Sequence, residues 1–228
     1  MDTDILDVPE PSQNQILVFT KTVGFRHESI EDGVTALQKL ADEQGYKLTT
    51  SENALDFTLD NLKNYQLVIF LSTTGDVLNG DQQRAFEGYV QQGGAYMGIH
   101  AASDTEHDWP WYGNLVGGYF RNHPQIQNAT IQVKIANHPA TSHLGSTWER
   151  LDEWYNFDDL SQDTTILLNL DETTYQGGTH GENHPISWYH EFDGGRSFYT
   201  GGGHTKESFT EPDFIDHLQG GIEWCLEK

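Results

Sequence analysis

Short, wholly apolar runs that alternate with helical patterns constrain the fold of this chain most. Residues 67–71 read Leu-Val-Ile-Phe-Leu, and residues 95–99 form a second apolar run of strand length. Strands that are apolar on both faces are typical of a parallel sheet covered by helices on both sides. The sequence therefore predicts an α/β fold with a mostly parallel sheet.

Other elements follow the same alternation. We expect a buried strand at 16–19 and further strands at 47–50, 186–189 and 197–200. A first helix is expected from Ser29, which with Asp32 forms a capping-box pattern, to Gly45. Two more helices are expected at 82–92 and from Pro212 toward the C-terminus.

The segment 109–181 departs from this pattern. Residues 131–135 alternate between apolar and polar side chains, which is typical of a strand with one solvated face. We expect an antiparallel extension or inserted lobe here, rich in aromatic residues. The predicted organisation is a loose acidic leader at 1–15, followed by a single domain at 16–228.

The charge of the chain excludes several classes of partner. Twelve Lys and Arg against thirty-five Asp and Glu give a formal charge of -23, which repels nucleic acid and anionic membrane surfaces. No dinucleotide fingerprint is present, so no nucleotide cofactor is expected. The single cysteine, Cys225, is predicted to be a buried thiol in the last helix. The sequence suits a cytoplasmic protein as written, and a periplasmic or secreted one if it is a mature form.

A strand-to-helix turn with a histidine at its apex is the clearest sign of an active site. The stretch reads Gly98-Ile99-His100-Ala101-Ala102, the Gly-x-nucleophile-x-small pattern that holds a reactive side chain clear of the backbone. Histidine occupies the position where such hydrolases carry cysteine or serine. We expect His100 to belong to a site whose covalent chemistry has been replaced.

Polar side chains also follow the other predicted parallel strands, at 22–28, 72–76 and 201–207. Ligands bind beyond the carboxyl ends of such strands, so these segments are expected to meet. His100 and His204 are predicted to be the catalytic pair, assisted by Asp104 or Glu153. Glu153 lies next to Trp154 and is the first candidate for a carboxylate with a raised pKa; Asp104 is the second.

The same histidines could instead hold a metal. One divalent, zinc-like ion on His100, His204 and His123, with a carboxylate completing the site, is the alternative to proton transfer between histidines. The other histidines are predicted to be surface or turn residues: His107, His138, His143, His180, His184 and His217.

Aromatic and hydrogen-bonding residues suit a sugar, whose C–H faces pack on rings while its hydroxyls take directed bonds. A purely structural aromatic core is the other interpretation. The substrate-binding candidates are Arg26, His27, Thr74, Trp111, Tyr112, Arg121, Asn122, His123, Trp154 and Glu207.

Six blocks in order resemble the ThuA-like (trehalose utilisation) family. They are Gly24-Phe25-Arg26-His27, Gly98-Ile99-His100-Ala101-Ala102, Trp111-Tyr112, Asn122-His123-Pro124, Glu153-Trp154-Tyr155 and Gly203-His204. The resemblance implies a flavodoxin-like core and the three-layer sandwich of class I glutamine amidotransferases. It places His100 at their cysteine, and His204 and Glu207 resemble their other two catalytic residues. Imidazole cannot replace a thiolate in the acyl intermediate, so cysteine-dependent glutaminase chemistry is not expected.

The resemblance implies a carbohydrate-active protein that acts on a glycoside, a disaccharide or a keto-sugar. Acid–base or metal-assisted hydrolysis or isomerisation is the predicted chemistry. Two alternatives stay open: a non-catalytic sugar-binding module, and an accessory subunit of a sugar-oxidising complex.

Overall fold

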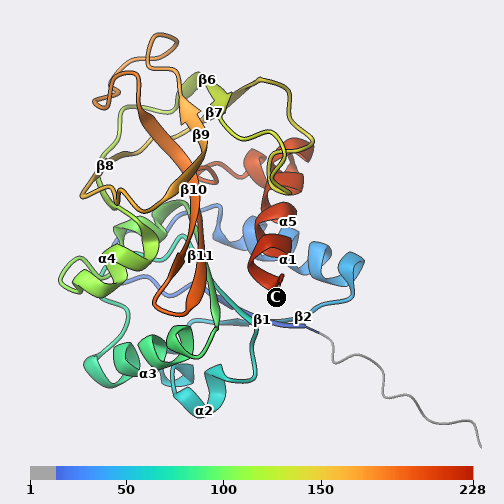
Figure 1. Cartoon of the computed structure of the whole chain (residues 1–228), viewed down its shortest axis with the longest axis vertical. Coiled ribbons are helices and arrows are strands. Elements are labelled where there is room, and N and C mark those ends of the chain that lie inside the picture. Colours follow the sequence, from blue (N-terminus) through green and yellow to red (C-terminus); the bar gives the residue numbers. More distant parts are fainter. Residues whose placement is uncertain (1–13, 228) are drawn as a thin grey trace, which may run out of the picture.

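One nine-stranded sheet forms the centre of the molecule in a computed structural model, which describes residues 14–227 (Figure 1). Its strand order is β2-β1-β3-β4-β11-β10-β9-β6-β7. The five strands from β2 to β11 run parallel, and the remaining four are antiparallel. The parallel strands are β2 (Lys47–Ser51), β1 (Gln15–Phe19), β3 (Leu67–Leu71), β4 (Ala95–Ile99) and β11 (Gly195–Thr200).

The antiparallel strands extend the same sheet. They are β10 (His184–Phe192), β9 (Thr165–Leu170), β6 (Gln127–Val133) and β7 (Thr147–Asp152). A separate ribbon pairs β5 (Tyr119–Asn122) with β8 (Asn156–Asp158). The predicted insertion at 109–181 therefore adds β9, β6 and β7 to the edge of the main sheet through β10, and forms the ribbon beside it.

Helices cover both faces of the parallel half, as the three-layer prediction requires. Figure 1 shows α1 and α5 on one side of the central strands, and α3 and α4 on the other. The α-helices are α1 (Ile30–Gln44), α2 (Leu59–Leu62), α3 (Gly80–Gln91), α4 (Pro110–Val116) and α5 (Pro212–Leu226), and the 3-10 turns are η1 (Ala54–Asp56), η2 (His100–Asp104) and η3 (Glu207–Thr210). None of the helices within residues 14–227 is long and apolar enough to cross a membrane.

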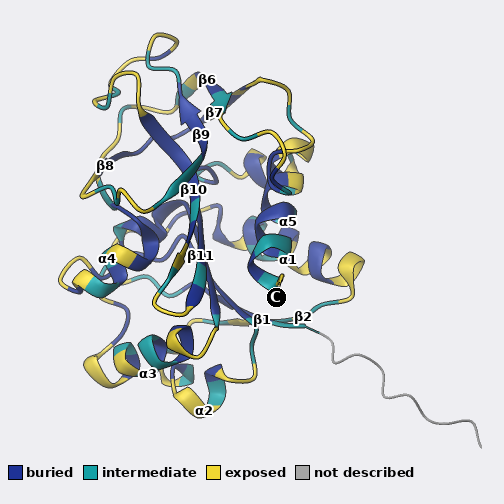
Figure 2. Cartoon of the chain, in the orientation of Figure 1, coloured by how far each residue is buried: buried dark blue, intermediate teal, exposed yellow. Residues whose placement is uncertain are grey.

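The core lies between the sheet and these helices (Figure 2). Every residue of β3 and β4 is buried, which explains why both sequences are apolar throughout. Phe70 on β3 stacks on Phe86 of α3 with ring centroids 5.4 Å apart, and Phe19 on β1 contacts Phe57 at 4.6 Å. The predicted strands at 67–71 and 95–99 are confirmed to the residue.

The expected capping box at Ser29 is wrong. Ser29 precedes α1, but its hydroxyl donates to the carbonyl oxygen of Gly203 at 3.0 Å rather than capping the helix. This bond joins the loop after β1 to the loop after β11. Residues 1–13 of the predicted leader lie outside the described residues, and Gln15 already begins β1.

Two histidines predicted to be surface or turn residues are instead buried in regular elements: His184 begins β10 and His217 lies on α5. His138 is buried too, but it lies in a turn, as the prediction allowed. His217 on α5 is fully buried, and its Nδ1 lies 2.7 Å from the carbonyl oxygen of Ala140. Burial lowers the pKa of His217 from 6.5 to about 3. Its place on an amphipathic helix that faces the sheet explains the error, because helical spacing alone does not distinguish a satisfied core histidine from an exposed one.

This burial predicts a loss of stability in acid. His217 of the unfolded chain takes up a proton below pH 6.5, whereas folded His217 stays neutral until about pH 3. The free energy of unfolding should therefore fall between pH 6.5 and 4, with His217 contributing up to about 1.4 kcal/mol per pH unit. His217→Gln should flatten this slope in urea titrations, and exposed His143→Gln should leave it unchanged. Equal slopes in both variants would contradict the prediction.

Candidate active site

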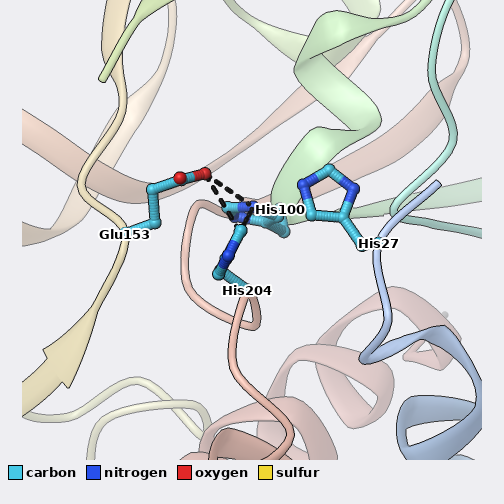
Figure 3. Close-up of side chains that lie close together, drawn as sticks. All are labelled: His27, His100, Glu153 and His204. Atoms are coloured by element: carbon cyan, nitrogen blue, oxygen red, sulfur yellow. Dashed lines mark hydrogen bonds and ion pairs between the residues drawn. The ribbon is translucent and has the colours of Figure 1, made fainter. Parts of the chain in front are cut away.

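Four ionisable side chains from four different segments meet beside the carboxyl ends of the parallel strands (Figure 3). His27 lies in the loop after β1, His100 directly after β4, Glu153 after β7 and His204 after β11. One ligand atom from each lies within 4.8 Å of the others. We call these four residues the His–Glu cluster.

His100 occupies a strained turn, as the elbow pattern predicts. Its φ is +51°, a left-handed conformation that costs a non-glycine residue about 1–2 kcal/mol. The imidazole is fully buried, and its Nδ1 lies 2.9 Å from the carbonyl oxygen of Gly201. A carbonyl oxygen can only accept, so Nδ1–H donates to it, and Nε2 is the ring nitrogen that faces the cluster.

Three ligand atoms of the cluster form a small triangle (Figure 3). The distance from His100 Nε2 to His204 Nδ1 is 3.2 Å, and Glu153 Oε2 lies 3.0 Å from His204 Nδ1 and 3.5 Å from His100 Nε2. Glu153 Oε2 can only accept, so a proton on His204 Nδ1 or on His100 Nε2 can be donated to it.

His27 completes the cluster without a hydrogen bond to its Nδ1. That atom is buried and has no partner among the described residues. The ring of His27 meets the rings of His100 and His204 edge-on, with centroids 4.8 and 5.1 Å away. Burial, together with repulsion from the charged forms of His100 and His204, lowers the pKa of His27 to about 3. His27 is therefore neutral at physiological pH, the form that binds a metal.

The raised pKa expected for Glu153 is wrong. Burial alone would raise it, but hydrogen bonding and charge interactions with His100 and His204 outweigh burial and hold the pKa of Glu153 well below its usual range. For His204 burial acts downward, and the interaction with Glu153 raises its pKa overall. Glu153 is thus ionised in the site, which suits a ligand or an orienting group better than a general acid.

His123 and Asp104 flank the cluster. His123 Nδ1 lies 2.9 Å from Glu153 Oε1 and from the carbonyl oxygen of Pro124, and its side chain is 42% exposed. The metal prediction had placed His123 among the ligands. In the structure His123 lies beside Glu153 and outside the His–Glu cluster. Asp104 pairs with His107 at 2.9 Å, and burial raises its pKa as predicted.

Three aromatic substrate-binding candidates lie elsewhere. Tyr112 and Trp154 are fully buried, and their polar atoms donate to the carbonyl oxygens of Ala102 and Gln127. Trp111 donates to Asp193 in the turn before β11, at the opposite end of the parallel strands. These three rings lie in the hydrophobic core or pack against it, as the aromatic-core interpretation expects.

Most polar candidates stabilise loops around the cluster. Their side chains make the following contacts: Arg26 with Glu31, Glu52 and the Thr20 carbonyl, Thr74 with the Phe25 carbonyl, Arg121 with Asp158 and Thr179, and Asn122 with Asn156. Glu207 is exposed, and no described contact joins it to His204. Glu153 takes the position beside His204 that the family resemblance had assigned to Glu207.

The sequence prediction missed two rings at the cluster. Tyr155 lies against His100 with ring centroids 4.3 Å apart, and Phe25 meets His27 edge-on at 4.9 Å. Phe25 is 66% exposed, although it is a large apolar side chain. Both residues belong to blocks that carry the family resemblance. Phe25 lies close to His27 in the sequence and Tyr155 lies close to Glu153, and this closeness was the signal from which they could have been predicted.

The donor set fits a divalent metal ion. Ligand atoms of one ion with bonds of about 2.1 Å lie about 3.0–3.4 Å apart, close to the edges of the triangle. Imidazole and carboxylate ligands suit zinc and similar first-row metals. The imidazole of His27 supplies a fourth candidate ligand. The residues present thus fit such an ion.

The comparisons with known proteins agree with this fold. The family model for ThuA, described as trehalose utilisation, matches residues 15–225. The chain belongs to the ThuA family. This membership indicates a carbohydrate-related role and covers all four residues of the His–Glu cluster. No curated protein matches the chain.

Solved structures share the fold. A ThuA-like protein from Bacteroides uniformis matches with TM-score 0.79 and 22% identity over 97% of this chain and 96% of its own. A ThuA-like protein from Parabacteroides merdae gives 0.78 and 18% over 94% and 90%. A GMP synthase component from Thermoplasma acidophilum gives 0.60 and 12% over 95% and 96%. The fold is therefore the glutamine amidotransferase-like α/β fold that the sequence predicts.

The contact between Glu153 and His204 makes a testable prediction. Glu153→Gln removes the negative charge that raises the pKa of His204, so the pKa of His204 should fall in metal-free protein. Histidine NMR titration measures this directly. Glu207→Gln, which alters a carboxylate not in contact with His204, is the control and should leave that pKa unchanged. A shift in the control alone would assign the partner role to Glu207.

Proposed function

We propose that this protein is a carbohydrate-active enzyme whose His–Glu cluster binds one divalent, zinc-like metal ion. Its substrate class is a glycoside, a disaccharide or a keto-sugar, and its reaction is hydrolysis or isomerisation. The proposal rests on one observation above all: His100 Nε2, His204 Nδ1 and Glu153 Oε2 lie 3.0 to 3.5 Å from one another, close to the spacing of ligand atoms around one metal ion.

The surroundings of the cluster support a metal ion over simple histidine pairing. An ionised, buried carboxylate is costly unless it is neutralised. A cation in the triangle would bind the lone pairs of Glu153 and of the neutral histidines together, with His27 near enough to contribute a further ligand atom. The Gly201 carbonyl already orients His100 through the opposite ring nitrogen, an arrangement typical of metal-ligating histidines.

The rim supports a sugar as the ligand. Phe25 presents an exposed ring next to His27, and sugar C–H faces pack on such rings. Family membership indicates the same class of substrate. The strongly acidic chain disfavours an anionic ligand such as a phosphorylated sugar, so the proposed substrate is uncharged.

His123 is the proposed proton-transfer residue. Its Nδ1–H points to Glu153 Oε1 or the Pro124 carbonyl, which leaves Nε2 free to accept a proton from a sugar hydroxyl or from water. No described residue is bonded to that Nε2. A bound divalent ion would polarise a sugar oxygen or lower the pKa of a bound water molecule. Glu153 holds both His123 and His204 in place through its two oxygens.

Metal binding is the first experimental test. Protein dialysed against zinc and then buffer should retain close to one zinc per chain by mass spectrometry. His204→Ala, which removes a half-buried ligand, should weaken zinc binding by about 100-fold or more. His107→Ala is the control, because His107 is exposed, contacts Asp104 and Tyr119, and is not one of the four residues of the His–Glu cluster. Wild-type protein that retains no zinc, manganese, iron or cobalt would contradict the metal proposal.

Turnover is measured on the metal-loaded protein with trehalose, other disaccharides and their keto derivatives, with products followed by NMR. Release of monosaccharide indicates hydrolysis, and rearrangement without cleavage indicates isomerisation. Sugar binding with full metal occupancy and no product would favour the non-catalytic sugar-binding module.

The exposed ring of Phe25 gives a prediction about substrate affinity. Phe25→Ala removes the platform beside His27 and should weaken sugar binding by about 3–10-fold, the range expected for one ring contact. Zinc affinity should not change, since Phe25 offers no ligand atom. Val23→Ala is the matched control, because Val23 is an equally exposed apolar residue of the same loop. Equal effects of both variants on sugar binding would refute a specific role for the ring.

A further inference from the structure

A buried carboxylate outside the cluster contacts the backbone of two cluster segments. Asp152 at the end of β7 is fully buried. Its Oδ1 accepts from the amide of Glu153 at 2.9 Å and from that of His204 at 3.1 Å. Its Oδ2 accepts from the amide of Gly203 at 2.8 Å and from the Ser208 hydroxyl at 3.2 Å.

The negative charge of Asp152 is balanced by the guanidinium of Arg150. Arg150 lies 3.1 Å from Asp152 Oδ2 and 3.1 Å from Glu211, and its guanidinium sits over the rings of Trp148 and Phe214. Arg150 itself is buried, so its position is fixed by packing as well as by charge. Asp152 thus accepts five hydrogen bonds or ion-pair contacts in a site closed to solvent.

The sheet alone does not fix Glu153 relative to His204. These residues follow β7 and β11, and three strands, β10, β9 and β6, separate β7 from β11 in the sheet. No backbone ladder therefore holds the two loops together where their side chains meet. Among the described residues, Asp152 is the group that hydrogen-bonds to the amides of both Glu153 and His204.

We propose that Asp152, held by Arg150, is a positioning residue that sets the distance between Glu153 and His204 and so tunes the metal affinity of the cluster. This inference rests on the proposed metal-binding function. Asp152 offers no ligand atom to the cluster, so its role is that of an outer partner. Loss of such a partner typically lowers metal affinity 10–100-fold.

Asp152→Asn tests the inference with little change in volume. The asparagine amide has one acceptor oxygen and one donor NH2 group, so one pair of amide or hydroxyl donors must face another donor. We expect zinc affinity, measured by competition with a chromophoric chelator, to fall about 10–100-fold. The visible spectrum of the cobalt-loaded variant should also change in intensity or position, because the ligand geometry differs.

Glu211→Gln is the matched control. Glu211 is the other carboxylate that pairs with Arg150, but it contacts neither the Gly203–His204 loop nor the amide of Glu153. Both variants disturb the buried arginine, and both should lower thermal stability. Only Asp152→Asn should change the zinc affinity and the cobalt spectrum.

The outcomes separate this inference from the proposed function. If wild-type protein binds zinc and Asp152→Asn matches it in affinity and cobalt spectrum, the positioning role is overturned while the metal site stands. If wild-type protein binds no metal, the metal proposal fails, and amide hydrogen exchange decides the positioning role. Faster exchange at residues 203 and 204 in Asp152→Asn but not in Glu211→Gln would support a clamp on the loops; equal exchange would overturn it.

Discussion

The geometry of the site depends on how the negative charge of Glu153 is balanced. A buried carboxylate is stable only with close hydrogen-bond donors or positive charge. His204 and His123 contact its two oxygens, and His100 lies against the first of them. The same contacts keep Glu153 ionised and align the histidine nitrogens, so the electrostatic requirement of one side chain fixes the geometry of the whole cluster.

The scaffold meets this requirement with bonds that cross between loops. Ser29 joins the loop after β1 to Gly203, and the Gly201 carbonyl fixes the ring of His100. Asp152 joins the end of β7 to the loop after β11. Because these bonds are buried or partly buried, each loop has little freedom to move relative to the others, and a preformed site results.

The fold is shared with amidotransferase-like proteins, and the side chain at the turn after β4 is a histidine. The turn after β4 keeps the strained backbone that suits a nucleophile, with φ of +51°, but presents an imidazole there. The partner of His204 comes from the antiparallel half of the sheet through Glu153, and not from Glu207 on the same loop. An additional set of strands thus supplies the carboxylate that changes a nucleophile scaffold into a His–Glu cluster.

The sequence by itself determined the parallel core, the elbow at His100 and the candidacy of His204, Glu153 and His27. These follow from local patterns: apolar runs of strand length, glycine spacing, and the rule that parallel strands place their carboxyl ends at one edge. Only the tertiary structure decided which residues meet. Trp111, Tyr112 and Trp154 read as sugar-binding aromatics but face the core or the far edge, and the lowered pKa of Glu153 reverses the local expectation from Trp154. Pairing between residues far apart in the chain depends on strand order and loop packing, which no local pattern encodes.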